Sequence, residues 1–73
     1  MIKEHDRVVL TVDLPEHKLY AGDVGVVVMI HGADQGYELE IIAVDGHTLD
    51  VITVDATQVR PVTEREIVHA RML

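Results

Sequence analysis

Short runs of apolar residues, many of them alternating with polar ones, fill most of this 73-residue chain. Alternation with a period of two places one set of side chains on the buried face of a strand and the other set toward solvent. The apolar residues are mainly Val, Ile and Leu, which favour strands. The pattern predicts five strands: Arg7–Val12, Gly25–His31, Tyr37–Ala43, Thr48–Val54 and Val59–Val62.

The segment Leu19–Gly25, just before the second predicted strand, carries the strongest turn signal. Gly22 can adopt the positive φ of a tight turn, and Asp23 can accept hydrogen bonds from nearby backbone N–H groups. Gly25 would let two backbones approach where a side chain would clash. We therefore expect a sharp, well-defined turn here.

The remaining connections complete the fold prediction. A long loop runs from Asp13 to Asp23, and Gly32–Gly36 forms a hairpin connection. Asp45-Gly46 predicts a two-residue type I′ hairpin turn, and Asp55–Gln58 predicts one helical turn before the last strand. Five short strands, a long first loop and a late helical turn are typical of a small SH3-like barrel. The predicted class is thus all-β, with the barrel in residues 1–62.

Residues 63–73 predict a different element. Thr63 and Glu66 have the spacing of a capping box, which marks the start of a helix. The predicted element is a short C-terminal α-helix whose apolar side holds Ile67, Val68, Ala70, Met72 and Leu73. So short a helix is unstable alone in water, so it must dock on its own barrel or on another chain.

The second predicted strand is apolar on both faces. If Val26, Val28 and Ile30 face inward, Val27 and Met29 face outward and leave an apolar exterior. Either the C-terminal helix covers this exterior, or the exterior mediates self-association, with helices exchanged between subunits of a dimer. The predicted interaction surface consists of Val9, Tyr20, Val27, Met29, Ile42, Ile67, Val68 and Met72.

Charge and composition narrow the function classes. The formal net charge is −7 and the six basic residues are scattered, which argues against binding to a nucleic acid backbone. An acidic domain of this size suits a protein partner, or uses its charge for solubility. No apolar run reaches membrane-spanning length and no signal-peptide pattern is present, so we expect a cytoplasmic protein.

The residue types needed for catalysis or cofactor binding are sparse. The chain has no serine and no cysteine, which excludes the usual hydroxyl and thiol nucleophiles as well as disulfides. Its five histidines lack metal-ligand spacing, although His31 and His47 could meet at hairpin ends and bind a metal adventitiously. Glu38 and Glu40 share one strand face, where solvation is expected rather than acid–base chemistry. We expect no catalytic, cofactor or metal site.

Several motifs carry a resemblance to a known family. Leu14-Pro15-Glu16, Ala21–Gly25, Tyr37–Glu40 and Val59–Val62 resemble segments of short bacterial proteins grouped as a domain of unknown function with an SH3-like barrel. The resemblance covers residues 6–62, implies the barrel and an accessory or antitoxin-like role, and assigns no activity. We expect a non-catalytic protein–protein interaction module that forms a homodimer and binds a further protein.

A second resemblance supports the alternative function. The Gly22–Gly25 turn is similar to that of KOW-type barrels in ribosomal and transcription proteins, which implies binding to RNA or to a ribonucleoprotein. Those barrels usually carry basic loops, whereas this chain is acidic.

Overall fold

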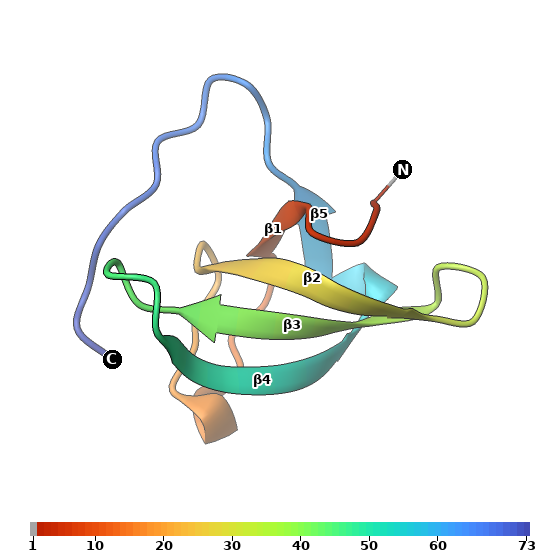
Figure 1. Cartoon of the computed structure of the whole chain (residues 1–73), viewed down its shortest axis with the longest axis horizontal. Helices are drawn as coiled ribbons and strands as arrows, with labels where there is room; N and C mark the ends of the chain where they lie inside the picture. The colour runs from red at the N-terminus through yellow and green to blue at the C-terminus, as the bar shows by residue number, and fades with distance from the viewer. Residues whose placement is uncertain (1) are drawn as a thin grey trace.

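The computed structural model describes residues 2–73, and all five predicted strands are present in it. They form one antiparallel sheet in the order β4-β3-β2-β1-β5 (Figure 1). Two single-turn 3-10 helices, η1 and η2, complete the described secondary structure. The bounds are β1 Arg7–Leu10, η1 Pro15–His17, β2 Val24–His31, β3 Gly36–Ile42, β4 Thr48–Asp55, η2 Ala56–Gln58 and β5 Val59–Pro61.

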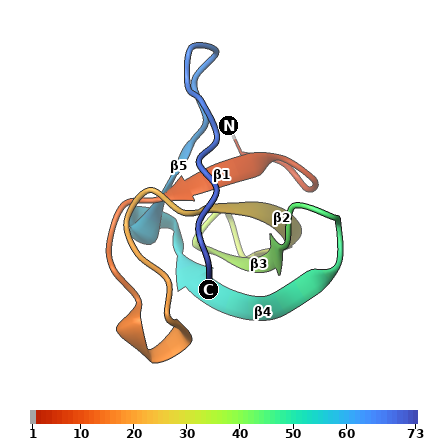
Figure 2. The same cartoon turned by 90° about the vertical axis from the view of Figure 1, so that its left-hand side faces the viewer.

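The sheet curls around one apolar core and gives a small barrel-like domain (Figure 2). All five strands contribute to the core, and Leu14 and Leu19 of the long first loop also belong to it. Val8, Leu10, Val27 and Leu39 are its most deeply buried large side chains. The succession of five strands along the chain and the helical turn before the last strand are confirmed. Within residues 2–73, no helix has the length and hydrophobicity needed to cross a bilayer.

A β-bulge in β2 decides which apolar side chains reach the core. Val27 pairs with Leu39 and Met29 pairs with Glu38, so Val28 is an extra residue in β2. Gly25 and Val27 face the core before the bulge, and Ile30 packs against it after the bulge. The predicted faces of Val26, Val27 and Val28 are therefore wrong. Residue 25, which also faces the core, is a glycine, so the apolar pattern of the sequence does not mark this face of β2.

Val9, on β1, is a further residue whose predicted exposure is wrong. It is only 5% exposed, although it lies outside the main core cluster. The reason is that β1 is an interior strand, on which Val9 is paired with Val24 of β2 and with Arg60 of β5. The side chains of these two directly opposed residues lie on the same face of the sheet as Val9 and restrict its access to solvent.

The glycine turn before β2 forms as the sequence predicts. Gly22 has φ +98°, and the Asp23 carboxylate accepts a hydrogen bond of 2.8 Å from the Tyr20 backbone N–H. Gly25 serves a different purpose from the one expected. A Cβ there would lie 3.2 Å from Ile41 Cδ1 and 3.3 Å from Leu39 Cβ, so side chains of β3, rather than a second backbone, occupy the space above it.

The β3–β4 hairpin is longer than the predicted type I′ turn. The Ala43 N–H donates to the His47 carbonyl and the Gly46 N–H donates to the Ala43 carbonyl, both at 2.8 Å. Of Asp45 and Gly46, only Gly46 takes a positive φ, of +98°. These features describe a three-residue loop that ends in a left-handed glycine, a common alternative to the two-residue turn.

The predicted C-terminal helix is absent. Residues 63–73, called the C-terminal segment below, contain one turn at Glu64–Arg65 and are otherwise irregular. Half of the capping box is formed, because the Thr63 N–H donates to the Glu66 carboxylate at 2.7 Å. The helix does not continue past it, since helix nucleation is costly and no packed surface supports so short a segment. The segment instead arches away from β5 and returns along the side of the barrel (Figure 1).

Candidate functional site

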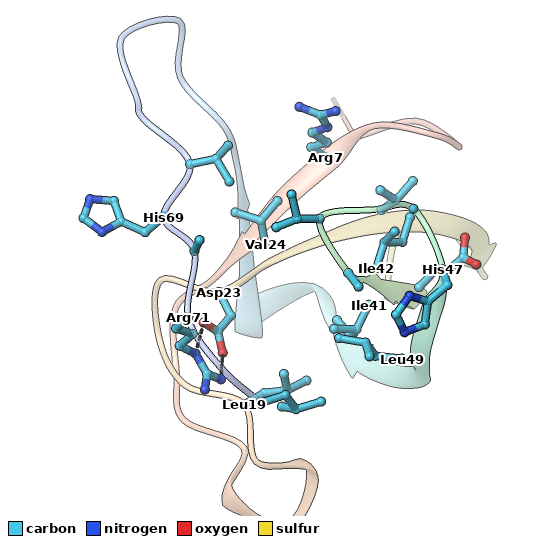
Figure 3. A pocket seen from close by; sticks show the side chains of 18 of the residues that line it. Arg7, Leu19, Asp23, Val24, Ile41, Ile42, His47, Leu49, His69 and Arg71 are labelled. Carbon is cyan, nitrogen blue, oxygen red and sulfur yellow. Dashed lines mark hydrogen bonds and ion pairs between the residues drawn. The ribbon is translucent and has the colours of Figure 1, made fainter.

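An apolar groove lies between the C-terminal segment and the end of the barrel that carries the β3–β4 hairpin (Figure 3). Its volume is about 740 Å³. The barrel wall comes from the start of β2, the end of β3 and the β3–β4 hairpin, and the opposite wall from residues 68–73. The main apolar side chains lining it are Val24, Ile42, Val44, Leu49, Val68 and Met72.

Both walls of the groove expose apolar side chains to solvent. On the hairpin, Val44 is 94% exposed, and Ile42 and Leu49 are also exposed. On the C-terminal segment, Met72 is 92% exposed, and Val68 and Leu73 are exposed as well. The chain thus brings the two walls near one another without closing them into a core.

The charged groups along the groove have both signs. Arg7 and Arg71 line it together with Asp23 and Glu40, and Glu40 accepts a hydrogen bond from the Thr48 hydroxyl. The lining also includes His47 and His69. The lining of the groove is therefore mixed in charge, although the chain as a whole is acidic.

Arg71 fastens the C-terminal segment to the loop that precedes β2. Its Nε and Nη2 donate to the two carboxylate oxygens of Asp23, with Nε to Oδ1 at 2.8 Å, and Nη2 also donates to the Lys18 carbonyl at 2.9 Å. The guanidinium carbon lies 5.2 Å from the centroid of the Tyr20 ring, within cation–π range. The hydrogen bonds from Arg71 lower the pKa of Asp23 below its ordinary value of 3.8. A carboxylate and a guanidinium in this arrangement make a two-bond fork.

A second fork holds the beginning of the segment. Arg60 of β5 donates from Nη1 and Nη2 to the two carboxylate oxygens of Glu66, at 2.7 and 2.6 Å. These bonds, with the additional bond from the Thr63 N–H, lower the pKa of Glu66 from its ordinary 4.5 to about 2. The segment is therefore attached through charged side chains at two points rather than through a packed apolar face.

With this geometry established, comparison with known proteins gives one match. The family model of a domain of unknown function (DUF4926) matches residues 4–61. The chain belongs to this family. The match covers the barrel, including Tyr20 and Asp23, and ends before the C-terminal segment. No match was found among curated proteins or among solved structures.

The structure places the eight residues of the predicted interaction surface in three groups. Ile42, Val68 and Met72 line the groove, and Tyr20 lies beside it under Arg71. Met29 and Ile67 are exposed but do not line it. Val9 and Val27 are buried, as described above, so they form no part of an exposed surface.

Sequence reasoning missed two prominent groove residues, Val44 and Leu49. Val44 stands directly before Asp45-Gly46, and an apolar residue at a hairpin tip is a signal that could have been noticed. Leu49 follows the hairpin and lies on the same outward face of β4 as Val51, whereas Ile52 and Val54 face the core. The alternation within this strand is therefore the signal that could have identified Leu49 as exposed.

The histidines do not assemble into a ligand set. His31 pairs with Gly36 at the start of β3, whereas His47 lies beyond the end of that strand, so the two are not brought together as hypothesised. His31 contacts Glu38 at 2.9 Å and His17 contacts Asp50 at 3.6 Å, each as a separate pair. Across residues 2–73, no group of three or more His, Cys, Asp or Glu residues could hold a metal ion.

Proposed function

We propose that this protein is a non-catalytic protein–protein interaction module that forms a homodimer through the apolar groove. The observation that carries the proposal is the exposure of Val44 on one wall and Met72 on the other. Exposed apolar surface costs free energy in water, so a groove with two exposed apolar walls favours burial against another molecule.

The size of the domain supports self-association. A domain of about this size buries only roughly 60% of the surface its unfolded chain exposes, so its own core provides limited stability. A second copy that binds only the folded state adds stability through mass action. An accessory or antitoxin-like role in the cytoplasm, with a further protein as partner, is the extension of this proposal that the family resemblance suggests.

Binding of RNA is the less favoured alternative. The guanidinium groups of Arg60 and Arg71 are already engaged by Glu66 and Asp23, and the formal net charge is −7. Phosphate binding needs clustered basic groups that can neutralise the backbone. A basic cluster of this kind is not expected from a chain with six scattered Lys and Arg residues.

The test is the oligomeric state of matched surface variants. Val44→Glu places a charge in the groove at a position that is almost fully exposed, so the barrel itself should fold normally. Val51→Glu is the control, because Val51 is 51% exposed on β4 and does not line the groove. Size-exclusion chromatography with light scattering, across a range of protein concentrations, measures the mass of each.

We expect the wild-type protein and Val51→Glu to form dimers and Val44→Glu to be monomeric. Circular dichroism should show the same fold for all three. A wild-type protein that stays monomeric at the highest concentration contradicts the proposal, and so does a Val44→Glu variant that dimerises as well as the wild type.

A further inference from the structure

The loop before β2 builds a site whose chemistry fits a guanidinium group. Two carboxylate oxygens from Asp23, the carbonyl of Lys18 and the ring face of Tyr20 converge on one guanidinium. The planar fork of arginine matches the carboxylate and stacks on the ring at the same time, whereas lysine offers only a point charge. We call these three groups the arginine site.

The loop forms the arginine site through its own local contacts. The Asp23 carboxylate accepts from the Tyr20 N–H at 2.8 Å, and the Asp23 N–H donates to the Tyr20 carbonyl at 3.0 Å. The Ala21 N–H donates to Asp13 at 2.9 Å, and Lys18, with φ +58°, donates its N–H to the Pro15 carbonyl. None of these bonds involves residues 63–73, so the site does not depend on Arg71 for its shape.

The C-terminal segment is held weakly by its own barrel. Among residues 2–73, no backbone–backbone hydrogen bond joins residues 63–73 to the barrel. The segment is held by the ion pairs of Glu66 and Arg71 and by the contacts of the Arg71 guanidinium with the Lys18 carbonyl and the Tyr20 ring. Ile67 is 84% exposed and Met72 is 92% exposed. The segment passes across one end of the barrel as an irregular, extended chain (Figure 2). Binding to its own barrel therefore leaves both the segment and the groove poorly covered.

Charge makes the segment a better link between two copies than the barrel surface. It contains two Glu and two Arg, so the whole formal charge of −7 is on residues 1–62. Two acidic barrels repel each other, whereas the neutral segment adds nothing to that repulsion when it approaches another barrel. Through Arg71, the segment fits the arginine site of another copy as well as its own.

We propose that the arginine site receives Arg71 from a second copy of this chain, so that two copies exchange residues 63–73. The exchange rests on the self-association proposed above and specifies its contacts. The Arg71 contacts are then the same as within one chain. The gain comes from the contact between the two copies, in which the segments and grooves bury apolar side chains that one copy leaves exposed. Exchange of identical elements is a low-cost route to a dimer.

Chain length and tethering set the conditions for this exchange. The residues between Pro61 and Arg71 can span about 30 Å when extended, comparable to the 33 Å longest dimension of the domain, so the segment can reach a neighbouring barrel. Binding within one chain has an effective concentration on the order of mM. The exchanged dimer is favoured over binding within one chain because it buries additional apolar surface. The population of the dimer rises with protein concentration.

Charge-reversal complementation in the full-length chain tests the proposal. Arg71→Glu keeps an intact arginine site but loses the arginine, and Asp23→Arg keeps the arginine but loses the site. We expect each variant alone to be monomeric and an equimolar mixture to give a heterodimer, detected by native mass spectrometry with one variant isotope-labelled. Asp23→Asn is the milder partner if Asp23→Arg does not fold, since its amide oxygen can still accept from Tyr20.

Two further variants sharpen the result. Arg71→Lys keeps the charge but not the fork, and we expect it to weaken dimerisation roughly tenfold. Val51→Glu should leave the dimer unchanged. If the wild type dimerises and both single variants dimerise equally well, the exchange is wrong while the proposed self-association stands. If the wild type is monomeric, the self-association itself fails. A mixture that stays monomeric beside a dimeric wild type also overturns the exchange.

Discussion

The barrel and the C-terminal segment both contain runs of Val, Ile and Met, but they use them in different ways. In the barrel, Val8, Val27 and Leu39 are completely buried in a core to which all five strands contribute. In the segment, Ile67 and Met72 remain almost fully exposed, and two arginine–carboxylate pairs hold the backbone in place. Apolar content alone therefore does not produce a core. The partners that strand pairing provides are also required.

The largest expected effect comes from a charge at Val27, the buried residue just before the bulge in β2. Val27→Asp buries an unpaired carboxylate at a cost of several kcal/mol, comparable with the total stability of a small domain. We expect this variant to be unfolded at 25 °C by circular dichroism. Met29→Asp, two residues away but 48% exposed, should remain folded. Equal effects at the two positions would contradict the assignment of faces.

The next effect compares one truncation in the barrel with one in the C-terminal segment. Leu39→Ala removes a fully buried side chain and should lower the free energy of unfolding by about 2–5 kcal/mol. Met72→Ala should change the free energy of unfolding by less than about 0.5 kcal/mol, because the Met72 side chain is already exposed in the folded state. Urea denaturation of both variants, at a concentration where the protein is monomeric, measures the difference. A large loss in Met72→Ala would show that the segment is packed.

Acid should release the segment before it affects the sheet. The pKa of Glu66 is lowered from 4.5 to about 2, so its ion pair with Arg60 is fully effective above about pH 4.5 and is lost as the pH falls toward 2. The lowered pKa of Asp23 acts in the same direction. We expect the Ile67 and Val68 methyl signals in NMR spectra to shift over this range. In Glu66→Gln, the part due to Glu66 should disappear, and an unchanged titration would refute the assignment.

The smallest expected effect is that of salt. Both ion pairs are partly exposed, so raising the ionic strength screens them and loosens the segment. Limited proteolysis between residues 63 and 71 should become at most a few-fold faster in high salt. Cleavage within the barrel strands should not change, because apolar burial rather than surface charge stabilises them. Faster cleavage of both regions would contradict the contrast drawn between them.

The sequence by itself determined the five strands, the helical turn before the last strand and the sharp turn at Gly22. These features depend on short-range rules, namely alternation of apolar residues, glycine conformations and side-chain hydrogen bonds to neighbouring backbone. Tertiary structure decided three further properties: the faces of β2, which depend on an extra residue against β3; the hairpin loop at Gly46; and the fate of residues 63–73. Arg71 binds Asp23 although the two residues are 48 positions apart in the sequence, and no local pattern predicts that contact. An isolated capping box cannot offset the cost of helix nucleation, so the surroundings of the segment, rather than its own pattern, determined its conformation.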